Sequence, residues 1–147
     1  MRNIVLSTLV MALALLAAVS TTVAQTGQGK ELAAVMLTGA AEVPGPGDSN
    51  GSGTVKLMVN PDKGEVCYEL TVANIQEATA AHIHEGAAGK EGPVKVGLDA
   101  PKTGTAKGCK SADAALMSAI VENPANYYVN VHNAEFSKGA VRGQLTK

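Results

Sequence analysis

The fold class is decided by residues 54–72, which read Thr54-Val55-Lys56-Leu57-Met58-Val59-Asn60-Pro61-Asp62-Lys63-Gly64-Glu65-Val66-Cys67-Tyr68-Glu69-Leu70-Thr71-Val72. Apolar and polar residues alternate on both sides of the central Asn-Pro-Asp-Lys-Gly run. Because side chains of a strand point alternately to two faces, each arm places its apolar residues on one face. Two alternating arms joined by a turn-rich segment predict a β-hairpin, and with it an antiparallel sheet.

Short alternating segments continue on both sides of this hairpin, over residues 32–38, 79–84, 94–98, 127–132 and 141–145. Glycine, proline and asparagine bound most of these segments, as is typical of strands joined by turns. The spacing of strands and turns predicts an all-β domain, a Greek-key β-sandwich.

Residues 111–122 depart from the alternating pattern. Alanine, leucine and isoleucine recur there at spacings of three and four, which predicts one short helix. We expect Ser111 to cap its N-terminus and Asn123-Pro124 to end it.

The first residues have the features of a secretory signal peptide. A positively charged start precedes an apolar run over residues 4–19, and small residues precede a cleavage point after Ala24. A retained membrane anchor is the alternative, but the run is short for a bilayer span of about 20 residues. We therefore expect a signal peptide over 1–24, a flexible lead-in over 25–31 and one domain over 32–146. The protein would be secreted or periplasmic, with no membrane span after signal cleavage.

The charge of the chain limits the classes of partner. The formal net charge is −1, and lysine and arginine form no cluster. Nucleic-acid binding needs such a cluster, so we expect a protein or surface partner and no nucleic acid.

Cys67 and Cys109 are the two cysteines of the chain. An exported chain with two cysteines most simply forms one disulfide. Two free thiols or a thiolate metal site are the alternatives, and the absence of a CxxC motif disfavours them. A disulfide would close a long loop and stabilise the fold by about 4 kcal/mol.

The three histidines of the chain lie in two of the predicted strands. His82 and His84 alternate with Ala81 and Ile83, and His132 belongs to the strand Tyr127-Tyr128-Val129-Asn130-Val131-His132. By the period of two, all three fall on the face opposite the apolar residues. If the two strands are neighbours, His82, His84 and His132 meet at one patch.

Three neutral imidazoles on a rigid sheet suit a Cu(II) or Zn(II) ion, with one position left open. Copper is the expected cofactor, and zinc is less favoured. Asn130 shares the face of His132 and can orient a ligand, while Glu85 can supply an oxygen if its strand bends after His84. The alternative is that the histidines are structural and hydrogen-bonded to neighbours. No arrangement for nucleophilic catalysis is present, and we predict no catalytic residue.

The chain resembles the CHRD domain, which is named from the extracellular antagonist chordin and is widespread in bacterial exported proteins. The resemblance covers residues 32–146 and is carried by His82-Ile83-His84-Glu85-Gly86 with Gly92-Pro93-Val94, and by Tyr128-Val129-Asn130-Val131-His132-Asn133 with Arg142-Gly143-Gln144-Leu145. It implies an exported binding module.

A more distant resemblance is to the Cu/Zn superoxide dismutases, Greek-key sandwiches whose copper is held partly by a His-x-His strand and a later Val-His. His82 and His84 fit the first element and His132 the second. This chain has no fourth histidine to act as the bridging ligand and no set of zinc ligands. The catalytic arginine of the dismutases has no counterpart here either, because the strand of Arg142 cannot be aligned with theirs. The resemblance implies a superoxide-dismutase-like or immunoglobulin-like sandwich with a remnant copper site.

Three functions follow from these observations. The first is an exported CHRD-domain binding module, non-catalytic, with a three-histidine copper-type site. The alternatives are a copper-dependent redox enzyme of superoxide-dismutase-like type, and a purely protein-interaction domain with structural histidines.

Overall fold

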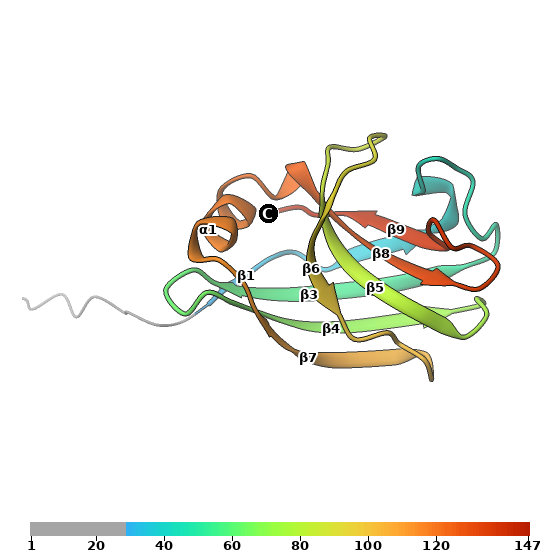
Figure 1. Ribbon diagram of the computed structural model, residues 1–147, viewed down its shortest axis with the longest axis horizontal. Helices are drawn as coiled ribbons and strands as arrows, with labels where there is room; N and C mark the ends of the chain where they lie inside the picture. The colour runs from blue at the N-terminus through green and yellow to red at the C-terminus, as the bar shows by residue number, and fades with distance from the viewer. Residues whose placement is uncertain (1–28) are drawn as a thin grey trace, which may run out of the picture.

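The computed structural model describes residues 29–147, so the signal peptide predicted over 1–24 lies outside the described residues. Strands dominate the described part, together with one α-helix and two single 3-10 turns (Figure 1). The elements are β1 (Lys30–Glu31), β2 (Val35–Thr38), η1 (Gly39–Ala41), β3 (Ser52–Asn60), β4 (Glu65–Ala73), β5 (Ala78–Glu85), β6 (Val94–Leu98), β7 (Thr105–Ser111), α1 (Ala114–Glu122), η2 (Pro124–Asn126), β8 (Tyr127–Asn133) and β9 (Val141–Gln144).

All strands belong to one antiparallel sheet, in the order β6-β5-β8-β9-β2-β3-β4-β7, and β1 pairs with β3. The sheet curls until its end strands β6 and β7 come close, so that it is nearly closed (Figure 1). After the β5–β6 hairpin the chain returns as β7 to pair with β4, which is a Greek-key path. The all-β prediction is confirmed, but the domain is barrel-like rather than a plain sandwich of two separate sheets.

The predicted hairpin of residues 54–72 is formed by β3 and β4. Its inward rows pair Val55 with Leu70 and Val59 with Val66. The turn is held by the side chain of Asn60, whose Oδ1 accepts from the Lys63 backbone N–H at 3.1 Å. The local alternation therefore specified both the strands and their register.

The core lies inside the curled sheet, and aliphatic side chains from both halves fill it. Most are fully buried, and α1 closes one end of the barrel with Met117 and Ile120. The inward residues of the strands include Leu37, Val55, Leu57, Val59, Val66, Leu70, Ala81, Ile83, Val129, Val131 and Val141. Because these rows point inward, the alternate rows of β5 and β8 face outward, and the histidines belong to those rows.

The helix begins later than the sequence predicts. Asp113 caps it, because its Oδ1 accepts from the backbone N–H groups of Ala115 at 2.8 Å and Leu116 at 3.3 Å. The predicted cap, Ser111, is wrong, because it is the last residue of β7 and pairs with Glu65. The helix still ends directly before Asn123.

The lead-in expected over 25–31 lies mostly outside the described residues. Its last two residues, Lys30 and Glu31, form β1 and pair with Val59 and Met58 of β3. Between residues 29 and 147, no helix is both long and apolar enough to cross a bilayer.

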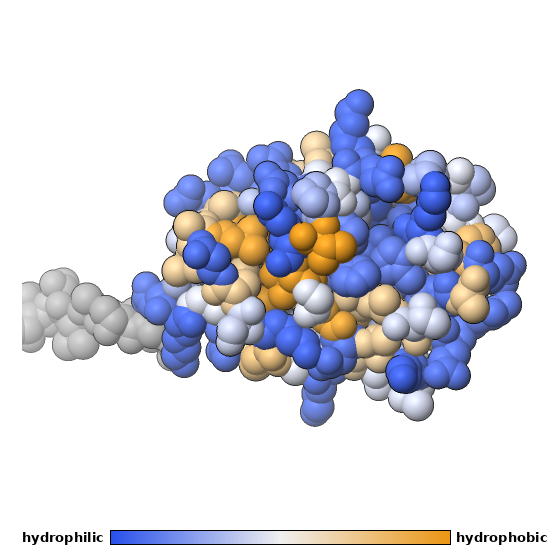
Figure 2. Space-filling model, viewed as in Figure 1, coloured by the Kyte–Doolittle hydropathy of each residue, from blue (hydrophilic) through white to orange (hydrophobic). Residues whose placement is uncertain are grey.

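A side-chain cluster joins the two ends of the sheet, where no strand pairing closes it. The Tyr68 hydroxyl of β4 donates to Asp99 Oδ2 at 2.7 Å, and Lys110 Nζ of β7 lies 2.6 Å from Asp99 Oδ1. Asp99 directly follows β6, so these bonds hold the end of β6 near β4 and β7. Beside this seam, Figure 2 shows a hydrophobic area between α1 and β6, and Val94 of β6 is half exposed.

Cys67 and Cys109 form a disulfide with an S–S distance of 2.04 Å. The two residues are directly opposite each other in the β4–β7 pair. No free cysteine remains among the described residues. The disulfide therefore ties an end strand of the sheet to its neighbour.

Removing this disulfide is expected to destabilise the domain. Replacing both cysteines, Cys67→Ala with Cys109→Ala, should lower the free energy of unfolding by about 2–4 kcal/mol, because the unfolded chain loses a long covalent loop. Urea unfolding of the oxidised protein and the double variant measures the difference. The wild type reduced with dithiothreitol serves as control and should match the double variant; equal stability of all three would contradict the prediction.

Candidate metal centre

The strands that carry the histidines are neighbours in the sheet. β5 and β8 pair antiparallel, with His82 opposite Asn130 and His84 opposite Tyr128. His132 lies opposite Ala80, and it is therefore diagonally across from His82. All of these outward side chains lie on the face away from the core, so the fold brings His82, His84 and His132 to one patch.

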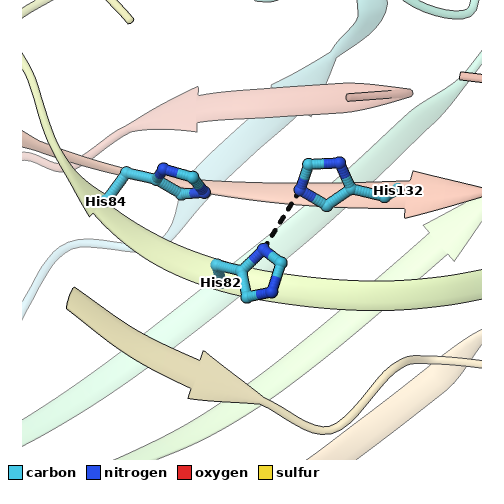
Figure 3. A group of neighbouring side chains, drawn as sticks. All are labelled: His82, His84 and His132. Atoms are coloured by element: carbon cyan, nitrogen blue, oxygen red, sulfur yellow. Dashed lines mark hydrogen bonds between the residues drawn. The ribbon is translucent and has the colours of Figure 1, made fainter. Parts of the chain in front are cut away.

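The three rings face a common space (Figure 3). Their centroids are 5.4 Å apart for His82 and His84, 4.9 Å for His82 and His132, and 6.3 Å for His84 and His132. One nitrogen from each ring can be chosen so that all three lie within 4.8 Å of one another. His82 Nδ1 and His132 Nε2 are 3.1 Å apart. Two ligands with bonds of about 2.0 Å are at most about 4 Å apart, so the rings have to draw slightly closer to share one ion.

Backbone carbonyls fix two of the rings. His84 Nδ1 lies 2.8 Å from the Gly92 carbonyl oxygen, and His132 Nδ1 lies 3.0 Å from that of Ser137. A carbonyl only accepts, so each Nδ1 carries the hydrogen, and in the neutral ring Nε2 has a free lone pair. Histidines that bind metal through Nε2 are commonly held in this way.

The free nitrogen of His84 is the most unusual atom of the cluster. The side chain is only 8% exposed. Its Nε2 is buried and has no hydrogen-bond partner within residues 29–147. A buried polar atom without a partner costs about 1–3 kcal/mol, so its presence needs an explanation. A bound cation would provide one.

Burial favours the neutral form of His82 and of His132. Burial lowers the pKa of His82 to about 4, helped by repulsion from His132 and His84 when they are charged. Burial also lowers the pKa of His132, against the opposing effect of the Ser137 carbonyl. A proton and a metal ion compete for the same nitrogen lone pair. A lowered pKa therefore leaves the lone pairs of these two rings available for a metal near pH 7.

Comparison with known families identifies the chain. The family model of the CHRD domain matches residues 33–145, most of the chain. The chain belongs to the CHRD domain family. No curated protein sequence and no solved structure gives a significant match, so the likeness to the superoxide dismutases stays a prediction.

The two segment pairs on which the resemblance was based meet at this site. Arg142 and Gln144 of β9 bind the loop of residues 86–92, which follows His84. Arg142 donates to the Lys90 carbonyl at 2.8 Å and the Ala87 carbonyl at 3.1 Å, and Gln144 Nε2 donates to the Gly86 carbonyl at 2.9 Å. These bonds hold the loop, and the loop supplies the Gly92 carbonyl that orients His84.

Arg142 also supports His84 through an aromatic ring. Its Cζ lies 3.4 Å from the centroid of the Tyr128 ring, and the guanidinium is a cation over the aromatic face. The His84 ring stacks on the same tyrosine, with centroids 4.8 Å apart and an angle of 9° between the planes. Arg142 is 2% exposed. It is a structural residue that positions the site.

Glu85, expected as a source of oxygen, does not join the histidines. Glu85 is the last residue of β5, opposite Tyr127, and its side chain alternates with that of His84 to the other face. Its Oε2 pairs with Lys95 Nζ at 2.8 Å. Asn130 does lie at the cluster, with Oδ1 3.0 Å from His132 Nε2.

Glu42 is a second charged residue beside the site, and no sequence motif indicates it. It follows η1, is only 5% exposed, and binds the side chain of Asn130. Burial raises its pKa to about 7, although the Arg142 charge and the Asn130 bond oppose the rise. Gly139 makes room for it, because a Cβ there would lie 2.3 Å from the carboxylate. Glu42 comes from a turn-rich connection without periodicity, so no local pattern signals its burial.

The buried carboxyl of Glu42 is expected to make stability depend on pH. Between about pH 4.5 and 7 the unfolded carboxyl is ionised while the folded one keeps its proton, so the folded state binds more protons and the free energy of unfolding falls as pH rises. We expect Glu42→Gln to gain about 2–3 kcal/mol relative to the wild type over this range, because glutamine does not titrate. Urea unfolding at several pH values tests this. Replacement of the exposed Glu91 by glutamine is the control, and parallel curves for wild type and Glu42→Gln would contradict the prediction.

Proposed function

We propose that this CHRD domain is a non-catalytic binding module outside the cytoplasm that holds one copper ion between His82, His84 and His132. The observation that carries the proposal is the buried His84 Nε2, which has no partner in the described part of the chain and faces the two other rings. The fixed Nδ1–H groups of His84 and His132 support it, because they direct both Nε2 lone pairs to the same space.

The donor set favours copper. Neutral imidazole suits both copper and zinc, and divalent copper binds a given nitrogen site more tightly than zinc. A bound copper ion would supply a Lewis-acidic centre with a position open to a further ligand. His82 and His132 are only partly buried, so such a ligand can approach from the solvent.

Export is part of the proposal. A disulfide is typical of a protein in an oxidising compartment. The signal peptide predicted over residues 1–24 is consistent with secretion or a periplasmic location. In that setting we expect the domain to bind a protein or surface partner.

Titration of metal-free protein with Cu(II) tests the proposal directly. We expect about one equivalent to bind with a Kd well below about 1 μM, measured against a competing chelator. A parallel titration with Zn(II) should give weaker binding. The absence of any binding tighter than micromolar would exclude the copper site.

Two further measurements separate the alternatives. Turnover of superoxide by the copper-loaded protein would support the redox enzyme. Metal analysis of protein purified from its native compartment, with no metal found, would support a pure interaction domain with structural histidines.

A further inference from the structure

The side chain of Asn130 connects the histidine cluster to the buried carboxylate. Asn130 is 2% exposed and lies on the outward face of β8. Its Oδ1 is 3.0 Å from His132 Nε2, and its side chain also bonds to Glu42. Asn130 is therefore held between an acid and a candidate metal ligand.

The acid determines which way the amide points. The NH₂ group is the only donor of an asparagine side chain, and a carboxyl oxygen of Glu42 accepts from it. Nδ2 of Asn130 therefore faces Glu42. Oδ1 then faces His132, which is the orientation that the structure has.

This orientation places two acceptors against each other. His132 Nδ1 gives its hydrogen to the Ser137 carbonyl, so Nε2 of the neutral ring carries a lone pair and not a hydrogen. His82 Nδ1, 3.1 Å away, can donate to that lone pair. Asn130 Oδ1 still receives no hydrogen from His132. An oxygen buried in this way costs about 1–3 kcal/mol unless a donor or a cation meets it.

The distances match those between ligands of one ion. For bonds of about 2.0 Å, neighbouring ligands are about 2.8 Å apart in a square plane and about 3.3 Å apart in a tetrahedron. The separations of His132 Nε2 from Asn130 Oδ1 and from His82 Nδ1 are 3.0 and 3.1 Å. Both values fall between these limits.

We propose that Asn130 Oδ1 is the fourth ligand of the metal centre and that Glu42 is the positioning residue that turns this oxygen toward the ion. The proposal rests on the proposed copper site and extends it to a set of three nitrogens and one oxygen. Such a set suits Cu(II), which takes tetragonal nitrogen and oxygen ligands, rather than Cu(I), which prefers sulfur.

Replacing Asn130 with leucine removes the oxygen at similar volume. We expect Asn130→Leu to bind Cu(II) about 10–100-fold more weakly than the wild type, with a changed Cu(II) EPR spectrum because water replaces the amide oxygen. Asn130→Asp keeps an oxygen donor and should bind at least as tightly as the wild type. Asn126→Leu, the same change at an exposed asparagine before β8, should alter neither affinity nor spectrum.

Glu42→Gln tests the positioning role. Glutamine can accept from Asn130 or donate to it, so both orientations of the amide become available. We expect several-fold weaker Cu(II) binding and two overlapping EPR spectra in place of one. A spectrum and an affinity equal to those of the wild type would show that Glu42 has no positioning role.

Failure of this inference can be told apart from failure of the copper site. If the wild type binds no copper, the proposed function itself fails. If the wild type binds one equivalent and Asn130→Leu binds it equally with the same spectrum, only the fourth ligand is wrong. Should Asn130→Leu not fold, a crystal structure of the copper-loaded wild type decides: an Oδ1 within about 2.5 Å of copper supports the proposal, and one beyond about 3 Å overturns it.

Discussion

Replacing His84 with alanine is expected to abolish tight copper binding. His84 contributes the buried lone pair for which no partner exists within the described residues, and its ring is oriented by the Gly92 carbonyl. Without it, His82 and His132 leave two nitrogens, and the Cu(II) affinity should fall by more than about 100-fold, the upper range for losing an outer-shell partner. Competition titration with a chelator measures the change.

Two variants make this result specific to the histidine. His82→Ala removes a half-buried ring that no loop carbonyl orients. This variant should also lose tight copper binding, and its loss of stability should be smaller than that of His84→Ala. Glu85→Ala changes the adjacent residue, whose carboxylate pairs with Lys95 outside the cluster, and should bind copper as the wild type does. One equivalent bound tightly by His84→Ala would refute the site.

Replacing Arg142 with methionine is expected to cause the largest loss of stability. The change leaves the carbonyls of Ala87 and Lys90 without their donor and removes the cation beside Glu42. Hydrogen bonds from a charged group contribute about 1.5–3 kcal/mol each, so the loss of both should cost at least about 3 kcal/mol.

The same variant should loosen the loop of residues 86–92. Limited proteolysis and hydrogen exchange should show faster reaction there than in the wild type, and urea unfolding gives the stability. Arg142→Lys keeps the charge but not the planar fork, so it should be intermediate. Lys95→Met, at an exposed ion pair, is the control and should cost less than about 1 kcal/mol. A cost below that value for Arg142→Met would contradict the role assigned to Arg142.

Local alternation was sufficient to predict the elements that build the site. The period of two in residues 54–72 predicted the β3–β4 hairpin, and the same period placed His82, His84 and His132 outward. The alternating pattern does not show whether β5 and β8 are neighbours, because strand pairing depends on contacts between segments far apart in the chain. The structure pairs them, and the three rings meet.

Other features depend on contacts far apart in the chain and could not be predicted. The near closure of the sheet depends on how β6 and β7 approach, and a single alternating strand carries no signal for it. Residues 102–110 are polar, and most of them form β7 because β4 pairs with them and Cys109 bonds to Cys67. Glu42 is buried only because a connection folds back over β8 and β9.

The cluster of Tyr68, Asp99 and Lys110 has a consequence for association between molecules. β6 and β7 are the two end strands of the sheet, and each has an unpaired edge. Such edges invite pairing with strands of other copies and lead to aggregation. Here the two edges face each other across the seam, joined by the tyrosine, the aspartate and the lysine. Each edge thus shields the other, and a chain whose seam opens would present both at once to its neighbours.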